Sequence, residues 1–159
     1  MSVTVLLIDD DQEFLDILAE RLTIRGLEVT TTASGRAALD LVRATWFNAI
    51  VLDLQMPDLD GLQVLEQLVA FNPAQQIILL TGHATVSKGV QAMKLGAADV
   101  LEKPVDIRQL VEKIHALSAV SAMAREEDRP GGLPPPQQEC WGQDLRRFLR
   151  RLLKREQAE

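Results

Sequence analysis

Residues 49–61, A-I-V-L-D-L-Q-M-P-D-L-D-G, decide the fold class of this chain. The segment 49–52 is a short, unbroken apolar run, which is typical of a strand buried on both faces of a parallel sheet. Asp53 follows where this strand should leave the sheet, and Pro57 then forces a turn because its ring fixes φ. A carboxylate in this place, just before a new helix, is where open α/β sheets carry their chemistry. The alternative, that Asp53 only ends a strand, depends on the rest of the chain.

The same strand-then-helix pattern recurs along the chain. Four further runs of apolar and β-branched residues predict strands at 3–8, 27–31, 76–80 and 98–102. Apolar residues at helical spacing follow each strand, in segments 14–22, 34–42, 60–71, 84–95 and 107–120. Strict alternation with short loops predicts a parallel sheet covered on both faces, with right-handed crossovers. We therefore expect a flavodoxin-like, doubly wound α/β fold with the strand order 2-1-3-4-5.

The composition is that of an ordinary globular protein, since 47% of the 159 residues are apolar and 25% are charged. This length accommodates one domain and a modest appendage. No apolar run approaches the ~18 residues of a membrane span, and no basic region precedes the first apolar run, so we expect no signal peptide. The single cysteine, Cys140, excludes an intramolecular disulfide and is typical of a reducing compartment, so we expect a cytoplasmic protein.

Charge and composition divide the chain into a predicted domain at 1–124, a linker at 125–139 and a tail at 140–159. Residues 1–120 carry 9 Lys and Arg against 16 Asp and Glu, which argues against non-specific binding of nucleic acid. The linker is acidic and rich in Pro and Gly, which predicts an extended segment. The tail carries 6 basic residues against 3 acidic ones, and its apolar residues fall on one helical face, which predicts a basic amphipathic helix. This face comprises Trp141, Leu145, Phe148, Leu149, Leu152 and Leu153.

Five side chains that can carry chemistry follow the predicted strands: Asp9, Asp10, Asp53, Thr81 and Lys103. In a sheet of the expected order they would meet in one shallow crevice at the switch point. Three crowded carboxylates repel one another, so at least one would stay protonated unless a cation lies between them, and hard oxygen ligands with room for water suit Mg²⁺. A lysine and a threonine hydroxyl suit an incoming phosphoryl group. The pattern indicates an Asp nucleophile, Mg²⁺ and two groups that hold the transferred phosphoryl group.

Four strings at the predicted strand ends carry a family resemblance. They are L-L-I-D-D-D at 6–11, V-L-D-L-Q-M-P-D-L-D-G at 51–61, I-L-L-T-G-H-A at 78–84 and L-E-K-P at 101–104. Over roughly residues 1–124 the chain resembles the receiver domains of two-component response regulators. The resemblance implies a phosphorylation-controlled signalling module, here a stand-alone receiver that acts through protein contacts.

The resemblance also implies roles for individual residues. Asp53 would be the phosphoacceptor. Asp9 and Asp10 would hold Mg²⁺, together with Asp53 and the backbone carbonyl of Gln55. Thr81 would supply the hydroxyl that moves toward the phosphate.

Lys103 would be the cationic partner of the phosphoryl group. The donor would be a phosphohistidine on a sensor histidine kinase or phosphotransfer protein. The acyl phosphate would hydrolyse slowly, so the expected role is that of a phosphorylated switch and not of an enzyme.

Val100 departs from the family pattern. Many receivers carry an aromatic residue three positions before the lysine, and this aromatic residue rotates inward once the threonine moves. With valine there, the usual aromatic read-out is not expected. The resemblance places Gln55 and His83 beside the phosphoryl group, where His83 could steer water or could simply be a polar rim residue.

Three further acids have simpler explanations. Asp11 is predicted to cap the helix after the first strand. Asp58 and Asp60 are predicted turn and cap residues.

Three other interpretations depend on particular positions. A Mg²⁺-dependent phosphohydrolase of the haloacid-dehalogenase type needs a second acid two residues after its Asp nucleophile, whereas position 55 is Gln. A flavodoxin-like nucleotide binder needs a Gly-rich phosphate loop after the first strand, where residues 9–11 are acids. The chain could also be the receiver of a transcription regulator, because T-G-H-A and L-E-K-P resemble receivers attached to ATPase-type activators.

The tail at 140–159 leaves several interpretations open. It could be a solvated helix, or it could dock through self-association as a homodimer, in the groove of a downstream protein target, or on anionic lipid. Direct DNA binding is not expected, because 20 residues cannot build a helix-turn-helix domain.

Overall fold

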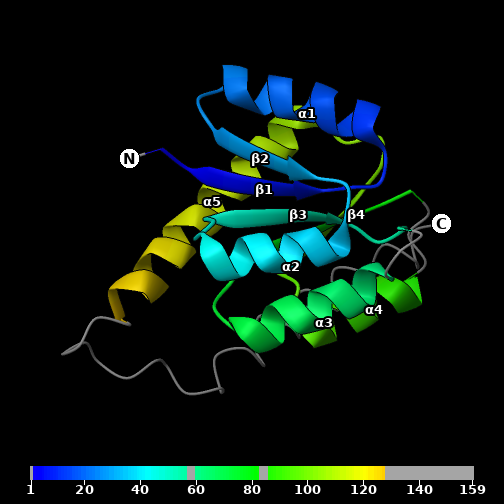
Figure 1. Ribbon diagram of the computed structural model, residues 1–159, viewed down its shortest axis with the longest axis vertical. Helices are drawn as coiled ribbons and strands as arrows, with labels where there is room; N and C mark the ends of the chain where they lie inside the picture. The colour runs from blue at the N-terminus through cyan, green and yellow to red at the C-terminus, as the bar shows by residue number, and fades with distance from the viewer. Residues whose placement is uncertain (1, 57–59, 83–85, 128–159) are drawn as a thin grey trace, which may run out of the picture.

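The computed structural model describes residues 2–56, 60–82 and 86–127, in which strands and helices alternate (Figure 1). The strands are β1 (Thr4–Ile8), β2 (Glu28–Thr32), β3 (Ala49–Asp53), β4 (Ile77–Thr81) and β5 (Asp99–Glu102). The helices are α1 (Gln12–Ile24), α2 (Gly35–Ala44), α3 (Gly61–Phe71), α4 (Val86–Leu95) and α5 (Ile107–Glu127).

The strands form one parallel sheet with the order β2-β1-β3-β4-β5, so the predicted fold class and strand order are confirmed. β1 lies inside the sheet, where it pairs with β2 on one side and with β3 on the other. The strand order therefore reverses between β1 and β3. This switch point is where doubly wound sheets bind their ligands, outside the carboxyl ends of the strands.

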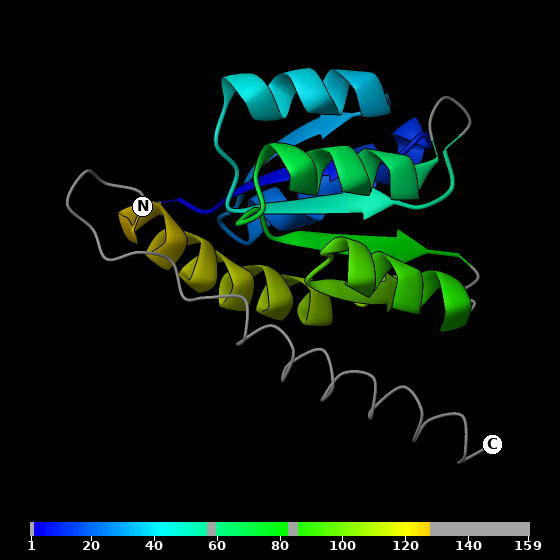
Figure 2. The same ribbon diagram turned by 90° about the horizontal axis from the view of Figure 1, so that it is seen from below.

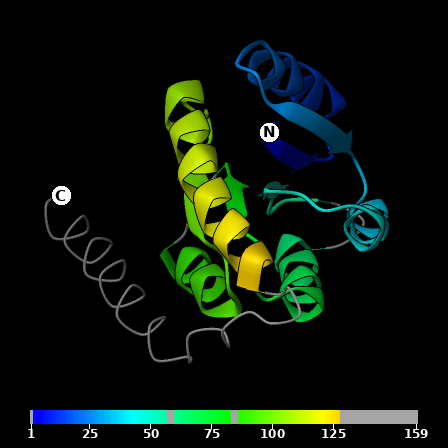
Figure 3. The ribbon, with the colours of Figure 1, turned by 90° about the vertical axis from the view of Figure 1, so that its left-hand side faces the viewer.

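Helices cover both faces of the sheet, as an unbroken apolar strand requires. α2, α3 and α4 pack on one face, where they bury side chains that alternate along the strands, such as Leu6, Leu52 and Leu79. Figure 2 shows these three helices side by side in front of the strands. α1 and α5 cover the other face (Figure 3), where they pack on the intervening strand residues, among them Leu7 and Val51.

Helix starts follow from the predicted caps. The carboxylate of Asp11 accepts from the N–H of Phe14 at the start of α1, and the carboxylate of Asp60 accepts from the N–H of Leu62 at the start of α3. Each cap satisfies one of the backbone donors that a helix leaves without a partner in its first turn. The capping roles predicted for Asp11 and Asp60 are confirmed.

The far end of the domain differs from the expectation. α5 continues to Glu127, whereas its apolar periodicity was evident only to position 120 and the linker was expected from 125. Residues 121–127 include Ala, Met, Arg and Glu, which favour helix, and the first proline comes only at position 130. The domain limits at 1–124, 125–139 and 140–159 stay a prediction.

Some predictions fall on residues that the structure does not describe. Asp58, His83, residues 128–139 of the linker and the whole tail at 140–159 lie outside the described ranges. Among the described helices, none combines the length and the apolar character that a membrane crossing requires.

Candidate functional site

The carboxyl edge of the sheet brings the predicted site residues together. β1 ends at Ile8, directly before Asp9 and Asp10, while Asp53 and Thr81 are the last residues of β3 and β4. All these strands are parallel, so their last residues lie at the same edge. The backbone N–H of Lys103 donates to the carbonyl of Thr81 at 2.8 Å, which fixes the lysine beside the end of β4.

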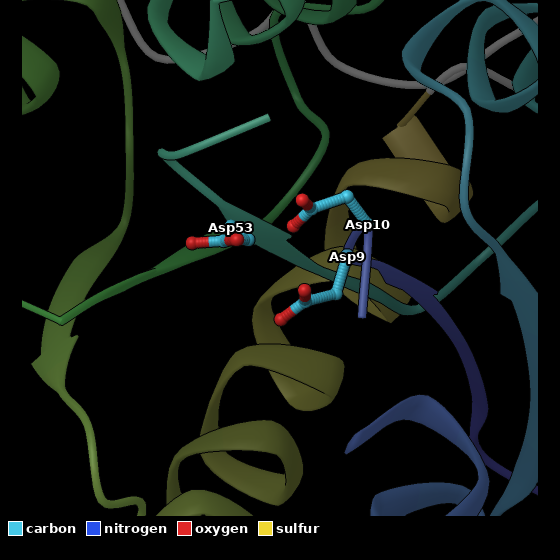
Figure 4. A group of neighbouring side chains, drawn as sticks. All are labelled: Asp9, Asp10 and Asp53. Carbon is cyan, nitrogen blue, oxygen red and sulfur yellow. The ribbon is translucent and has the colours of Figure 1, made fainter. Parts of the chain in front are cut away.

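Three carboxylates form the centre of the site. Ligand oxygens of Asp9, Asp10 and Asp53 all lie within 4.8 Å of one another, and Figure 4 shows them grouped at the ends of β1 and β3. Asp9 is 2% exposed and Asp53 is 4% exposed, whereas Asp10 is exposed to solvent. The cluster is therefore open on the side of Asp10 and closed behind the other two acids.

Backbone donors fix the two buried carboxylates. Oδ1 of Asp9 accepts from the N–H of Asp11 at 3.0 Å, and Oδ1 of Asp53 accepts from the N–H of Gln55 at 3.2 Å. In each case the donor lies two residues after the acid, in the loop that leaves the strand. The loops thus orient both side chains, and the second oxygen of each carboxylate remains for other partners.

Lys103 provides the positive charge of the site. Its Nζ donates to Oδ2 of Asp9 at 2.7 Å and lies 3.7 Å from Oδ2 of Asp53. The side chain of Lys103 is about one quarter exposed, so it joins two buried acids to the rim of the crevice. It lies where a group attached to Asp53 would meet a point charge.

Phe14 is a contact of Lys103 that was not predicted. Nζ lies 4.4 Å from the centroid of the Phe14 ring, within the range of a cation–π interaction. Phe14 belongs to the first turns of α1 and is only partly buried. Phe14 begins the segment 14–22 whose apolar spacing predicted a helix, and nothing in that pattern indicates which neighbour meets its ring.

The electrostatics of the cluster act mainly on Asp53. Burial raises the pKa of the Asp53 carboxyl from its usual 3.8 to about 6. The hydrogen bond from Gln55 lowers this pKa, the charge of Asp9 raises it, Lys103 lowers it and Asp10 raises it. Burial is the largest cause of the shift, and the repulsion between acids that the sequence led us to expect adds to it, so nearby positive charge would lower the pKa of Asp53.

Gly61 packs directly on the backbone of the phosphoacceptor candidate. A Cβ at this position would lie 2.5 Å from Cα of Leu54 and 2.7 Å from the carbonyl oxygen of Asp53. The N–H of Gly61 donates to the carbonyl of Leu54 at 3.2 Å. Only glycine fits such a close approach, so the start of α3 and the end of β3 are in direct contact.

Thr81 and Val100 are placed as their positions in the sheet require. Thr81 is 3% exposed and pairs with Glu102 in the register between β4 and β5. Val100 pairs with Leu79 and lies partly buried against the core that α3 and α4 share. What valine does to the read-out at this position stays a prediction.

The donor set fits Mg²⁺. Hard carboxylate oxygens attract this ion, which binds few protein ligands and completes its coordination with water and phosphate oxygens. Two buried acids and one exposed acid provide such ligands with an open side, and a divalent cation would offset the burial and the repulsion that raise the pKa of Asp53. The metal-binding role of the Gln55 carbonyl stays a prediction.

Comparison with known proteins gives a consistent result. The family model of the response regulator receiver domain matches residues 5–115. The chain is 41% identical over 128 residues to the transcriptional regulatory protein FixJ of Azorhizobium caulinodans, a match that covers 80% of this chain and 61% of that protein. The chain spans about half or less of the length of several other curated regulators that it matches.

Solved structures share the fold. A CheY-like receiver domain protein from Methanospirillum hungatei superposes with a TM-score of 0.74 at 29% identity, covering 78% of this chain and 99% of that one. A response regulator from Burkholderia pseudomallei has a TM-score of 0.68 at 29% identity, covering 81% of this chain and 76% of that one. Its crystal structure contains a phosphorylated aspartic acid, a calcium ion and citrate.

Proposed function

Because the chain belongs to the family of response regulator receiver domains, we propose that it accepts a phosphoryl group on Asp53. The observation that carries this proposal is the arrangement of Asp53 at the end of β3, with Lys103 at 3.7 Å and two further acids within 4.8 Å. The phosphorylated aspartic acid in the Burkholderia pseudomallei relative supports the same chemistry.

The proposed transfer uses one carboxylate oxygen of Asp53 as the nucleophile. The bond between phosphorus and its donor atom breaks as the bond between phosphorus and the oxygen forms, which leaves an acyl phosphate on Asp53. Lys103 would neutralise part of the phosphoryl charge, and Thr81 would offer its hydroxyl to a phosphoryl oxygen. Asp53 has to be ionised to attack, so with a pKa of about 6 the transfer should slow as the pH falls through this value.

Mg²⁺ would bind to Asp9, Asp10 and Asp53, with the carbonyl of Gln55 as a further ligand. When bound, it would supply positive charge that lowers the pKa of Asp53 and offsets the charge on the transferred group. The open side at Asp10 would leave room for water and for phosphoryl oxygens.

The proposed donor is a phosphohistidine on a sensor histidine kinase or phosphotransfer protein in the cytoplasm. The family match supports the donor class, and a single cysteine in 159 residues is typical of a reducing compartment. The acyl phosphate would then hydrolyse slowly on the receiver. Output would pass through protein contacts, since the acid surplus in residues 1–120 argues against direct DNA binding by this part of the chain.

Mass spectrometry of the intact protein tests the assignment of Asp53. The chain is incubated with acetyl phosphate, with Mg²⁺ or with EDTA, beside the variants Asp53→Asn and Asp60→Asn. An adduct of about 80 Da that requires Mg²⁺, is absent from Asp53→Asn and persists in the cap variant Asp60→Asn is the expected result. An adduct that survives in folded Asp53→Asn would contradict the assignment.

A further inference from the structure

The outward face of α1 carries large apolar side chains that remain exposed. Ile17 is 46% exposed and Ile24 is 76% exposed. With Glu13 and Glu20 they follow one another at spacings of four, three and four residues, so the four side chains form a single stripe along the helix. The buried leucines of α1 lie on the opposite side. Apolar residues grouped with charges on one exposed face are typical of an interaction surface.

Acids give this stripe a negative charge. α1 contains Glu13, Asp16 and Glu20 against a single basic residue, Arg21. Among the described residues, none of the ion pairs involves any of these three acids. Asp16 accepts a hydrogen bond from Gln12 on the same helix. In the part of the chain that the structure describes, no basic side chain forms an ion pair with these acids, and Arg21 and Arg25 at the end of the helix leave a surplus of one acid.

No other described helix combines a surplus of acids with two exposed large apolar residues. α2 and α4 have more basic than acidic residues. α3 exposes one large apolar residue, Phe71, and contains one acid. α5 exposes Val120 and Met123 but contains as many basic as acidic residues.

The sequence of the tail at 140–159 complements the α1 face. Its apolar residues recur at helical spacing, and six basic residues accompany them: Arg146, Arg147, Arg150, Arg151, Lys154 and Arg155. A helix with this pattern would bury its apolar face against exposed isoleucines while its arginines meet carboxylates at the rim. The same basic residues would repel the lysines of α4.

The linker is long enough for the tail to reach α1. α1 and α5 contact each other on the same face of the sheet (Figure 3). The 21 residues of α5 span about 31 Å, and the twelve residues 128–139 span at most about 40 Å when extended. Since the linker can exceed the length of α5, a segment that leaves the end of this helix can return along it to any part of α1.

We propose that residues 140–159 dock as a basic amphipathic helix on the outward face of α1, in the same chain. The docked helix covers Ile17 and Ile24 and pairs its arginines with Glu13, Asp16 and Glu20. This contact goes beyond phosphorylation of Asp53 and does not depend on it. The two proposals can therefore fail separately, because neither the contact nor its test requires a phosphoryl donor.

The unique cysteine allows the test on the full chain. A nitroxide spin label is attached to Cys140, the first residue of the tail, and amide signals of the ¹⁵N-labelled protein are compared before and after the label is reduced with ascorbate. The expected result is a paramagnetic loss of intensity for the amides of α1, which disappears on reduction. Broadening confined to α4 or to the end of α5, or no broadening in the described helices, would overturn the proposal.

A second sample separates a contact within one chain from a contact between copies. Chains of natural isotopic abundance that carry the nitroxide are mixed with ¹⁵N-labelled chains that carry no nitroxide. The α1 signals of this mixture should keep their intensity. If they are broadened as strongly as in the singly prepared sample, the tail contacts a second copy and the proposal of a contact in the same chain is wrong.

Charge reversal tests the surface itself. In Glu13→Lys/Glu20→Lys the paramagnetic loss on α1 should disappear, whereas it should persist in the control Asp40→Lys/Glu66→Lys, whose exposed acids belong to α2 and α3. High salt should weaken the contact in the unmodified chain, because the screening length falls from about 10 Å at 0.1 M to about 3 Å at 1 M. Each double variant is first shown to be folded by its amide spectrum. If the paramagnetic loss of intensity on α1 is equal in the two variants, the proposed pairing between arginines and these acids is wrong.

Discussion

The ammonium of Lys103 lies between a carboxylate and an aromatic ring, because Nζ is 2.7 Å from Oδ2 of Asp9 and 4.4 Å from the centroid of Phe14. If the ion pair with Asp9 were its only contact, the ammonium of Lys103 would move with the Asp9 carboxylate when Asp9 binds a metal ion. The ring gives the ammonium a second favourable contact, on the α1 side of the crevice. Phe14 therefore helps to fix the position from which Lys103 can reach a group on Asp53.

Replacing the ring tests this relationship. Loss of a cation–π contact of about 0.5–1 kcal/mol in Phe14→Leu should slow phosphorylation by acetyl phosphate about 2–5-fold. Phe14→Trp should retain the wild-type rate, because its indole offers a cation the better face. The exposed residue Phe71 provides the control, since Phe71→Leu should leave the rate unchanged. A rate in Phe14→Leu equal to wild type would show that the ring has no part in placing the lysine.

The raised pKa of Asp53 predicts how stability depends on pH. The folded chain retains a proton on this carboxyl up to about pH 6, whereas the unfolded chain releases it near 3.8. The folded state thus binds more protons between these values, so the free energy of unfolding falls as the pH rises through this interval and stays lower above it. In EDTA, Asp53→Asn should therefore be more stable than wild type at pH 7, by about 1–3 kcal/mol.

Urea unfolding at pH 4.5 and pH 7 measures this effect in both proteins. The advantage of Asp53→Asn should shrink at the lower pH, and addition of Mg²⁺ at pH 7 should stabilise wild type more than the variant. An equal pH dependence for the two proteins would show that Asp53 titrates normally in the folded state.

Lys103→Met removes the positive charge that partly offsets the acids. The pKa of Asp53 should rise further, because the charge of Lys103 lowers it in the native site. Phosphorylation by acetyl phosphate should fall sharply. Lys113→Met, which removes the ion pair between Lys113 of α5 and Asp99 of β5, is the matched control and should retain phosphorylation. Carboxyl ¹³C titration by NMR reports the pKa directly, and an unchanged Asp53 titration in Lys103→Met would contradict the role of the lysine.

Two glycines provide a matched pair for stability. Gly61→Ala places a Cβ within 2.8 Å of three backbone atoms of Asp53 and Leu54, so it should cost about 2–4 kcal/mol of unfolding free energy. Gly89→Ala in α4 meets no atom within 4 Å and should stabilise by about 0.5–1 kcal/mol. Thermal or urea unfolding of both variants distinguishes them. A Gly61→Ala protein as stable as wild type would mean that β3 and α3 separate easily.

The fold was predictable because strands β3 and β4 are apolar up to their last residue and every predicted strand alternates with a helical segment. Segments such as 49–52 are apolar throughout, and this pattern fits a strand only if helices cover both faces of the sheet. The site followed from topology, since parallel strands bring Asp9 and Asp53 to one edge whatever the details of packing. Both conclusions depend on where the strands end and on their alternation with helices, which the runs of apolar residues mark.

The contacts within the site depend on helix rotation and on electrostatic balance, which a sequence does not display. The apolar spacing of segment 14–22 predicted a helix at Phe14, but the angle at which α1 packs decides that the ring of Phe14 meets Lys103. The repulsion among the three acids was expected, whereas assigning the raised pKa to Asp53 required the burial and the distances of its neighbours. The end of α5 was missed because its last turns lack the apolar stripe that marked the rest of the helix.

The contact of Gly61 with Asp53 differs in kind from the contact that links Asp9 to α1. The N–H of Asp11 reaches Asp9 through a hydrogen bond of 3.0 Å, which can lengthen or tilt at modest cost. The backbone of Asp53 and Leu54 lies so close to Gly61 that a methyl group at this position would have no space. A displacement of the backbone at Asp53 toward α3 therefore displaces the first turn of that helix through steric contact. The first turn of α1 can instead remain in place while Asp9 moves.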